Sequence, residues 1–100
     1  MKCIASFHPE AQQELIAIAV WYDGRRAGLG DEFVDAVSAK VVDIYKAPER
    51  FPIVHDDIRQ AILRRFPYVV YFRLAGKRVL VVSVFHAHLD TESLWARLDP

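Results

Sequence analysis

The apolar run RVLVVSVF, residues 78–85, limits how this chain can fold more than any other segment. A strand with so little polar alternation is covered on both faces or lies centrally in its sheet. The chain must therefore supply neighbouring strands and packing elements. Its 100 residues, with 53% hydrophobic content, are enough for one compact core and too few for two. We expect a single domain, residues 1–100.

Two further strand patterns precede this run. IRQAILRR, residues 58–65, is joined to YVVYFRL, residues 68–74, at Phe66-Pro67, and AGK connects the second pattern to residues 78–85 with a length typical of hairpins. Pro67 cannot donate a ladder hydrogen bond, so it belongs to a turn or to a strand start. These patterns predict a three-stranded antiparallel meander.

The first half of the chain is patterned as helices. In residues 8–26, Pro9 suits the first helical position and Glu10 the first turn, and apolar residues follow at helical spacing. A second helical pattern begins after Gly28 and Gly30 and ends at Pro48. The short link predicts an antiparallel helical hairpin. Residues 3–7 are expected to form an opening strand, and residues 90–100 a short helical turn.

The order β-α-α-β-β-β predicts an α+β fold, with the N-terminal helical hairpin packed on one face of a mostly antiparallel four-stranded sheet. The other face of that sheet is expected to lack cover. An apolar surface left in water is usually a binding surface. We therefore expect Tyr68, Tyr71 and Arg73 to contribute to a docking face.

Charge and cysteine content limit the expected cellular compartment and the kinds of partner. The single cysteine, Cys3, cannot form an internal disulfide, and no stretch approaches the ~20 apolar residues of a membrane span, so we expect a soluble cytoplasmic protein. The net charge is zero, yet acids predominate before residue 58, and residues 59–88 contain no acid. This asymmetry predicts a basic pole that could meet nucleic acid or an acidic peptide.

Five segments in order carry a family resemblance: FHPEAQQEL, WYDGRRAGLGDEF, APERFP, RQAILRRFPYVVYF and VFHAH, with Trp95 and Arg97 behind them. Together they resemble the RelE/ParE superfamily of toxins from type II toxin–antitoxin modules, over nearly the whole chain. The resemblance implies a small toxin neutralised by a cognate antitoxin. In that superfamily, RelE-like toxins cut messenger RNA on the ribosome, whereas ParE-like toxins inhibit DNA gyrase.

The PERFP and RRFPY segments are closer to the ParE branch, which includes plasmid stabilisation proteins. The resemblance therefore implies a toxin that acts by binding a target such as gyrase, not by breaking bonds. Two alternatives stay open. One is a RelE-like ribosome-dependent endoribonuclease, and the other is a non-toxic binding module with the same fold.

His86 and His88 are the candidate catalytic pair of the nuclease alternative, because histidine both accepts and donates protons near neutral pH. Arg64 or Arg65, together with Tyr68, would complete such a site. As successive strand residues, Arg64 and Arg65 should point to opposite faces. The simpler interpretation is that His86 hydrogen-bonds to backbone at the strand end and His88 is exposed. Relatives carry paired arginines where His88 and Leu89 stand, which weighs against the nuclease.

The same histidines could be metal ligands, with His8, His55 or Cys3 as a third. A structural zinc site usually has four ligands in closely spaced pairs, and no second pair is present, so we predict neither a metal nor a cofactor. Six residues are proposed to contact the antitoxin or the target: Trp21, Arg59, Tyr68, Tyr71, Arg73 and Trp95. Of these, Arg59 and Arg73 could bind an acidic tail of the antitoxin through charge-assisted pairs. Trp21 is a candidate anchor for the antitoxin or for a second copy of the toxin.

Overall fold

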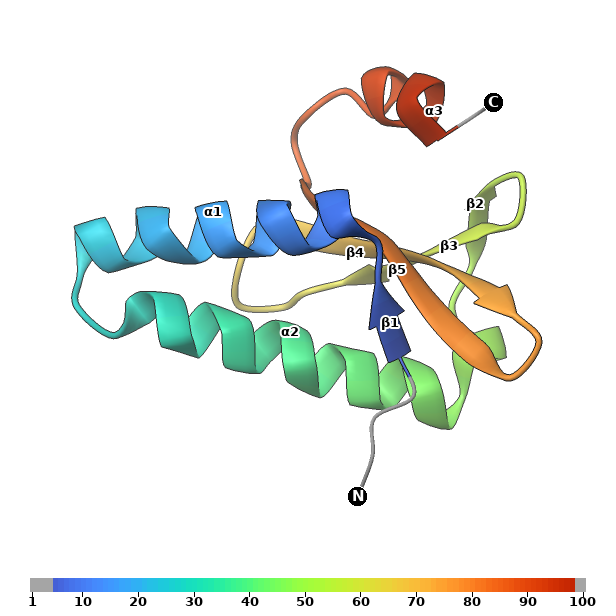
Figure 1. The fold of residues 1–100 in the computed structure, drawn as a ribbon, viewed down its shortest axis with the longest axis horizontal. Helices are drawn as coiled ribbons and strands as arrows, with labels where there is room; N and C mark the ends of the chain where they lie inside the picture. Colours follow the sequence, from blue (N-terminus) through green and yellow to red (C-terminus); the bar gives the residue numbers. More distant parts are fainter. Residues whose placement is uncertain (1–4, 99–100) are drawn as a thin grey trace.

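The computed structural model describes residues 5–98, shown in Figure 1. The chain forms an α+β fold, as predicted. Its elements in order are β1 (Ala5–Phe7), α1 (Pro9–Arg25), α2 (Leu29–Lys46), the 3-10 turn η1 (Pro48–Arg50), β2 (Ile53–His55), β3 (Ile58–Ile62), β4 (Tyr68–Ala75), β5 (Arg78–His86) and α3 (Glu92–Leu98). No helix within these residues is both long and apolar enough to cross a membrane.

The strands form one sheet in the order β1-β5-β4-β3-β2. β1 is parallel to β5, and the remaining pairs are antiparallel. The apolar run of residues 78–85 therefore lies inside the sheet between two neighbours, as its composition predicts. The sheet has five strands instead of four, because β2 forms between the second helix and residue 58, where the sequence patterns predicted no strand. β2 turns sharply into β3 through Asp56, whose φ is 51°.

The helical hairpin covers one face of the sheet, as predicted (Figure 1). Its two helices approach closely at Gly30, where an added Cβ would lie 2.3 Å from the backbone oxygen of Ala19. The Asp23 carboxylate accepts a 2.8 Å hydrogen bond from the N–H of Gly30, which fixes the start of α2. Beneath the hairpin lies the larger hydrophobic cluster, which includes Phe33, Val37, Val41, Ile44, Val70, Phe72, Val81 and Val84.

The opposite face of the sheet is covered by α3, so the prediction of an open face was wrong. Leu94 of α3 is 1% exposed and packs on Ile58, Val69, Tyr71 and Val82, with Trp95 and Leu98 beside it. Residues 92–98 form a full helix because their apolar positions face the sheet. A seven-residue amphipathic segment is too short to be stable alone, so its packing partner could not be read from local pattern.

The end of β3 also differs from the prediction. The strand ends at Ile62, and the tight link to β4 is closed by hydrogen bonds from the Leu63 N–H to the Tyr68 oxygen and from the Tyr68 N–H to the Phe66 oxygen. Arg64 and Arg65 consequently lie in a bend, not on successive strand positions. Both border the same hollow beside α2, so the prediction that they point to opposite faces was wrong. Cys3, from the expected opening strand, lies outside the described residues.

Candidate functional site

The histidine pair lies where β5 ends, against the first residue of β4. The N–H of His88 donates to Nδ1 of His86 over 3.1 Å, and the ring of His86 meets the ring of Tyr68 edge-on at 5.0 Å between centroids. The two histidine rings are 5.4 Å apart. We call Tyr68, His86 and His88 the strand-end group. Its local geometry follows the simpler interpretation, with His86 bound to backbone and His88 exposed.

A hollow of about 280 Å³ lies beside the strand-end group. It is lined mainly by apolar side chains, which are Ala17, Ile18, Val84, Phe85 and Leu89, together with Glu14, Tyr68 and His86. No lysine or arginine of residues 5–98 lines this hollow, so it offers no such cation to hold a phosphate group. This surface therefore suits an apolar side chain of a protein partner better than a nucleic-acid backbone.

Tyr68 is half-buried and belongs to an aromatic cluster beneath the hairpin. Its ring lies 5.4 Å from Phe33 and 6.4 Å from Tyr22. Burial raises the pKa of Tyr68 above its usual value, and burial together with the neighbouring Tyr68 raises the pKa of Tyr22. The Tyr68 phenol therefore keeps its proton at neutral pH and can donate a hydrogen bond but not act as a base.

Tyr71 and Trp95, both predicted to contact the antitoxin or the target, pack against each other. Tyr71 is 5% exposed, and its ring meets Trp95 edge-on at 5.3 Å. On its other side Trp95 stacks on His55, with centroids 4.5 Å apart and planes inclined by 7°. Burial raises the pKa of Tyr71. Tyr71 is thus inaccessible to a partner while α3 stays in place.

Three of the predicted cations are bound within the chain. Arg59 Nη1 donates to the Phe51 oxygen over 2.7 Å and so ties η1 to the sheet. Arg73 Nε lies 3.3 Å from Asp57 Oδ1, an ion pair whose geometry falls short of a hydrogen bond. Arg65 pairs with Glu32 of α2. Hydrogen bonding from Arg65 lowers the pKa of Glu32.

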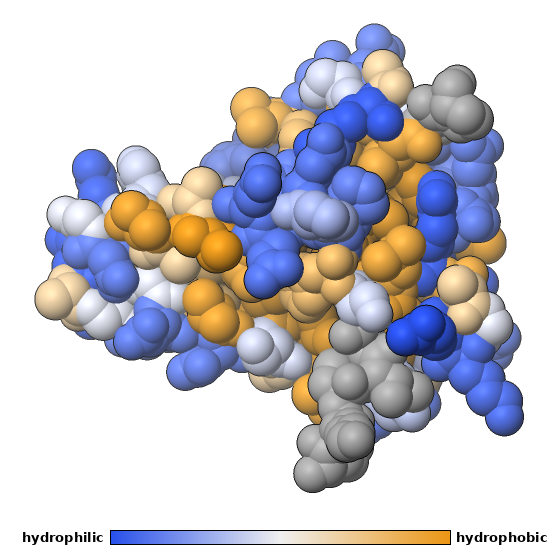
Figure 2. Space-filling model, viewed as in Figure 1, coloured by the Kyte–Doolittle hydropathy of each residue, from blue (hydrophilic) through white to orange (hydrophobic). Residues whose placement is uncertain are grey.

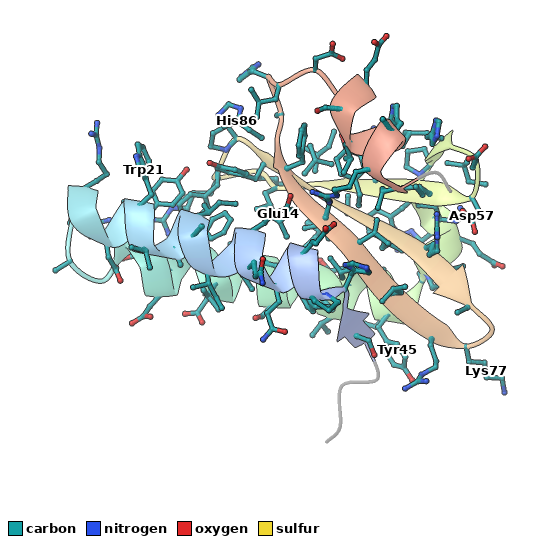
Figure 3. The ribbon with its side chains drawn as sticks, turned by 45° about the horizontal axis from the view of Figure 1, so that its top comes forward. Glu14, Trp21, Tyr45, Asp57, Lys77 and His86 are labelled. Carbon is teal, nitrogen blue, oxygen red and sulfur yellow. The ribbon has the colours of Figure 1, made fainter. Side chains whose placement is uncertain are left out.

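Trp21 is exposed, as a binding residue would be. It lies on α1 with Ile16 and Val20. Ile16 is 55% exposed, Val20 65% and Trp21 55%. We call them the α1 strip. The Arg25 guanidinium covers the Trp21 ring at 4.9 Å. Figure 2 shows apolar residues exposed along α1, and Figure 3 shows Trp21 pointing away from the sheet.

Glu14 was missed by sequence reasoning, although it joins three elements. Its Oε1 accepts hydrogen bonds from the Ser83 hydroxyl at 2.9 Å and the Val84 N–H at 3.0 Å, and its Oε2 accepts from Arg97 of α3 at 3.0 Å (Figure 3). β1 pairs with β5 only as far as Val81. Beyond that residue, the Glu14 carboxylate accepts the hydrogen bond that the Val84 N–H donates from the edge of β5. The sequence feature that could have pointed to a polar partner such as Glu14 was Ser83, a polar residue inside the apolar run.

The possible metal ligands do not converge in residues 5–98, where no group of three His, Cys, Asp or Glu side chains could hold an ion. His8 has another use, because its Nδ1 accepts the Glu10 N–H and so caps α1. Cys3 lies outside the described residues.

Several solved structures of toxin–antitoxin proteins have a similar fold. A chain of the chromosomal ParDE system from P. aeruginosa superposes with a TM-score of 0.75 at 18% identity, over 84% of this chain and 95% of that one. A mutant E. coli RelE toxin in complex with an antitoxin RelBc peptide gives 0.62 at 18% identity, over 100% and 97%. The intact E. coli RelBE complex gives 0.59 at 19%, over 88% and 100%.

Among curated protein sequences, none is significantly similar to this chain. The family profile described as the ParE toxin of the type II toxin–antitoxin system parDE matches residues 5–90, which span every strand and both long helices. The resemblance noted from the sequence is thereby confirmed. The chain belongs to the ParE toxin family of type II toxin–antitoxin systems.

Proposed function

We propose that this protein is a toxin that acts by binding and inhibiting a target such as DNA gyrase, and that a cognate antitoxin neutralises it in the cytoplasm. The observation that carries the proposal is the setting of the strand-end group. His86 borders a mostly apolar hollow that no lysine or arginine of residues 5–98 lines, and the ring of His88 lies 5.4 Å from the ring of His86. A site that cleaves RNA needs cations around the scissile phosphate.

The contacts of the arginines also support a binding function, because three arginines that a nuclease could use already have partners within the chain. Arg65 is held by Glu32, Arg73 by Asp57, and Arg59 by backbone carbonyls. Arg64 faces α2, away from the contacts of the strand-end group. Within residues 5–98, the ring and hydrogen-bond partners of His86 and His88 include no lysine or arginine. A binding activity requires no such array.

The antitoxin is proposed to cover the α1 strip. Large apolar side chains left exposed on one helix are typical of a partner surface, and tryptophan is among the residues that contribute most to binding. The hollow beside the strand-end group lies next to α1 and shares Ala17 and Ile18 with it. A partner helix laid along α1 could insert a side chain there.

A RelE-like endoribonuclease is the second candidate, favoured by the proximity of Tyr68, His86 and His88. In that mechanism the histidines would act as acid and base. A third candidate, a non-toxic binding module, shares every surface described above and differs only in having no cellular effect.

Growth and two purified reactions distinguish these functions. Expression without antitoxin should arrest growth, and the purified protein should inhibit supercoiling by gyrase while leaving ribosome-bound message intact. His88→Ala should leave both results unchanged. Message cleavage that His88→Ala abolishes would instead establish the nuclease, and normal growth with the protein confirmed as folded would leave only the binding module.

The proposed antitoxin surface has its own test. Trp21→Ala should weaken the complex with the antitoxin encoded beside the gene by roughly a hundredfold, the effect of a central anchor. Lys77→Ala, at the β4–β5 turn, is a matched exposed control and should change the affinity little. Equal affinities for both variants would remove the α1 strip from the interface.

A further inference from the structure

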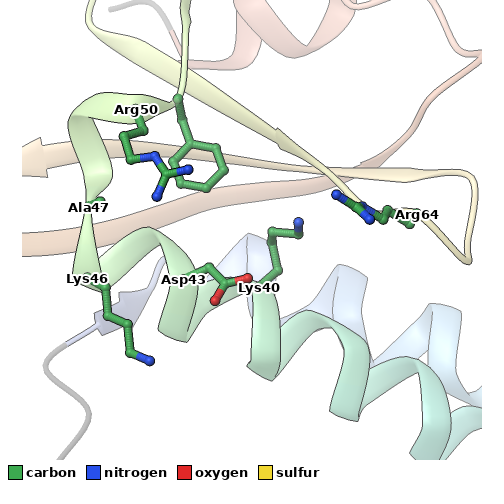
Figure 4. Close-up of a pocket in the computed structure, with 7 residues that line it drawn as sticks. Lys40, Asp43, Lys46, Ala47, Arg50 and Arg64 are labelled. Atoms are coloured by element: carbon green, nitrogen blue, oxygen red, sulfur yellow. The ribbon is translucent and has the colours of Figure 1, made fainter.

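A groove between α2 and the link after β3 gathers positive charge, away from the α1 strip and the strand-end group. It has a volume of about 410 Å³ and is lined by the C-terminal half of α2, by η1 and by Arg64 (Figure 4). We call it the α2 groove. An adjoining hollow of about 310 Å³ shares Lys40, Asp43 and Arg64 and extends the groove along α2. These volumes are within the range of small-molecule sites, which begins at about 300 Å³.

The cations of the α2 groove have no partner in the described part of the chain. Among residues 5–98, no ion pair joins Lys40, Arg50 or Arg64 to a carboxylate. Arg65, by contrast, is held by Glu32. The three free cations come from α2, η1 and the link after β3, and they surround one space. Because they repel each other there, an anionic ligand that contacts them is favoured.

The charged side chains follow a fixed order along the groove. Figure 4 shows Lys40 and Arg64 extending into the same space at one end, Asp43 next to them, and Arg50 at the other end. The sequence of elements fixes this order, since Lys40 lies one helical turn before Asp43 on α2, and Arg50 follows on η1. Two cations, a carboxylate and an arginine therefore succeed one another.

We propose that the α2 groove binds a nucleotide, a nucleoside that carries at least two phosphate groups. Lys40 and Arg64 bind the phosphates, Asp43 accepts hydrogen bonds from the ribose hydroxyls, and the guanidinium of Arg50 stacks on the base. The order phosphate, ribose, base in such a ligand matches the order of these side chains. This inference goes beyond the proposed function and holds or fails whatever the toxin inhibits.

The position of Asp43 is the observation that selects a nucleotide over a simple anion. A carboxylate among cations would repel inorganic phosphate, whereas it is the group that commonly binds ribose hydroxyls in nucleotide sites. The end of the groove at Lys40 also suits the phosphates, because it lies away from the C-terminus of α2, where the helix dipole is negative. The uncharged part of the ligand would lie nearer that terminus.

A free nucleotide fits the groove better than a nucleic-acid strand. A continuous phosphate backbone needs an uninterrupted row of cations, and Asp43 interrupts this one. Phe51 is the one aromatic side chain that residues 5–98 contribute to the groove, and it packs edge-on against Phe72 at 5.9 Å. Successive bases would therefore find no row of stacking surfaces.

The test uses the purified full-length protein and ADP in isothermal titration calorimetry. Binding should be saturable, with one ADP per protein, and should weaken with added salt. Lys40→Gln with Arg64→Gln should weaken it at least about tenfold, as expected for lost charge-assisted pairs. Lys77→Gln with Arg78→Gln, at the β4–β5 turn, removes the same charge elsewhere and should change the affinity little. Circular dichroism checks that each variant is folded.

Asp43→Asn distinguishes a nucleotide site from an anion site. The variant loses a charged acceptor for the ribose and also loses a repulsive charge, so its affinity for ADP relative to pyrophosphate should fall about tenfold. Dideoxy-ADP, which lacks both ribose hydroxyls, should show no such change relative to pyrophosphate. Arg50→Gln should weaken ADP binding more than pyrophosphate binding, because pyrophosphate has no base to stack.

Four results would overturn the proposal. They are the absence of saturable ADP binding, an equal loss of affinity in the turn variant, pyrophosphate binding as tight as ADP binding, and an unchanged preference in Asp43→Asn. So would a single-stranded RNA of about ten nucleotides that binds more tightly than ADP and depends on Lys40 and Arg64, because the groove would then serve a nucleic-acid strand.

Discussion

The two faces of the sheet are covered in different ways. The hairpin face is sealed by two long helices over an extended apolar cluster, with Tyr22, Phe33, Phe66 and Tyr68 packed ring against ring. The α3 face is covered by one short helix through Leu94 and Trp95. There, polar contacts add to the packing, because Arg97 reaches Glu10 at 2.9 Å and Glu14 at 3.0 Å.

The difference indicates where the stability of the fold resides. Burial of apolar area is the dominant favourable contribution to folding, and it is concentrated under the hairpin. A seven-residue helix has little stability of its own, so α3 stays in place only through its contacts with the sheet and α1. Substitutions on the hairpin face should therefore unfold the whole domain, whereas substitutions on the α3 face should first release α3.

The largest effect is expected for Phe33→Ala. Phe33 is fully buried, and its ring lies 5.2 Å from Phe66 and 5.4 Å from Tyr68. The cavity should lower the free energy of unfolding by about 4 kcal/mol. Urea denaturation followed by far-ultraviolet circular dichroism measures it, and Phe33→Leu should cost clearly less. A loss below that of Leu94→Ala would contradict the contrast between the two faces.

Leu94→Ala should cost about 3 kcal/mol, since Leu94 is the buried residue of α3. The loss should appear first as faster hydrogen exchange of amides in residues 92–98, while those of β4 and β5 stay protected. Ala96→Ser, at an exposed position of the same helix, is the control and should leave exchange nearly unchanged. Uniform acceleration across the sheet would show that the two faces unfold together.

A smaller loss, about 2 kcal/mol, is expected for Glu14→Ala, because the buried Ser83 hydroxyl and the Val84 N–H lose their acceptor. The coupling between Glu14 and Arg97 can be isolated in a double-mutant cycle with Arg97→Ala. It should exceed the coupling between Glu10 and Arg97, since Glu10 is 49% exposed and Glu14 only 23%. Equal couplings would mean that Glu14 contributes only as a surface charge.

The sequence predicted what local pattern determines. The two helices and the meander follow from periodicity, and Pro9, Pro48 and the AGK turn are local signals. β2 was missed because IVH is too short to show alternation. The bend at Arg64 and Arg65 was missed because a strand's end depends on its pairing partner. The predicted direction of both side chains was wrong for the same reason.

Contacts between distant residues were the ones that sequence reasoning could not find. Glu14 binds Ser83, which lies 69 positions later, and the sequence around neither residue predicts this contact. Trp95, Tyr71 and His55 come together only because α3 folds back over the sheet. The proximity of Tyr68 to His86 was within reach, because antiparallel pairing of the last two patterns brings the start of one to the end of the other.

The remaining prediction concerns alkaline pH and leaves stability near neutrality unchanged. Burial raises the pKa of Tyr71 on the α3 face and of Tyr68 on the hairpin face. Below the unfolded pKa of about 10, both the folded and unfolded states hold these protons. Above it the unfolded chain loses them first, so unfolding releases protons and the free energy of unfolding falls as pH rises toward the folded pKa.

Urea titrations at about pH 8 and about pH 10.5, on either side of the ordinary tyrosine pKa, measure this loss. Tyr71→Phe should reduce it more than Tyr68→Phe does, because Tyr71 is 5% exposed whereas Tyr68 is only half-buried. If α3 opened before the rest of the domain unfolds, Tyr71 would ionise in the opened form and the order would reverse. The same pair of variants thus tests whether α3 shields the sheet as firmly as the hairpin does.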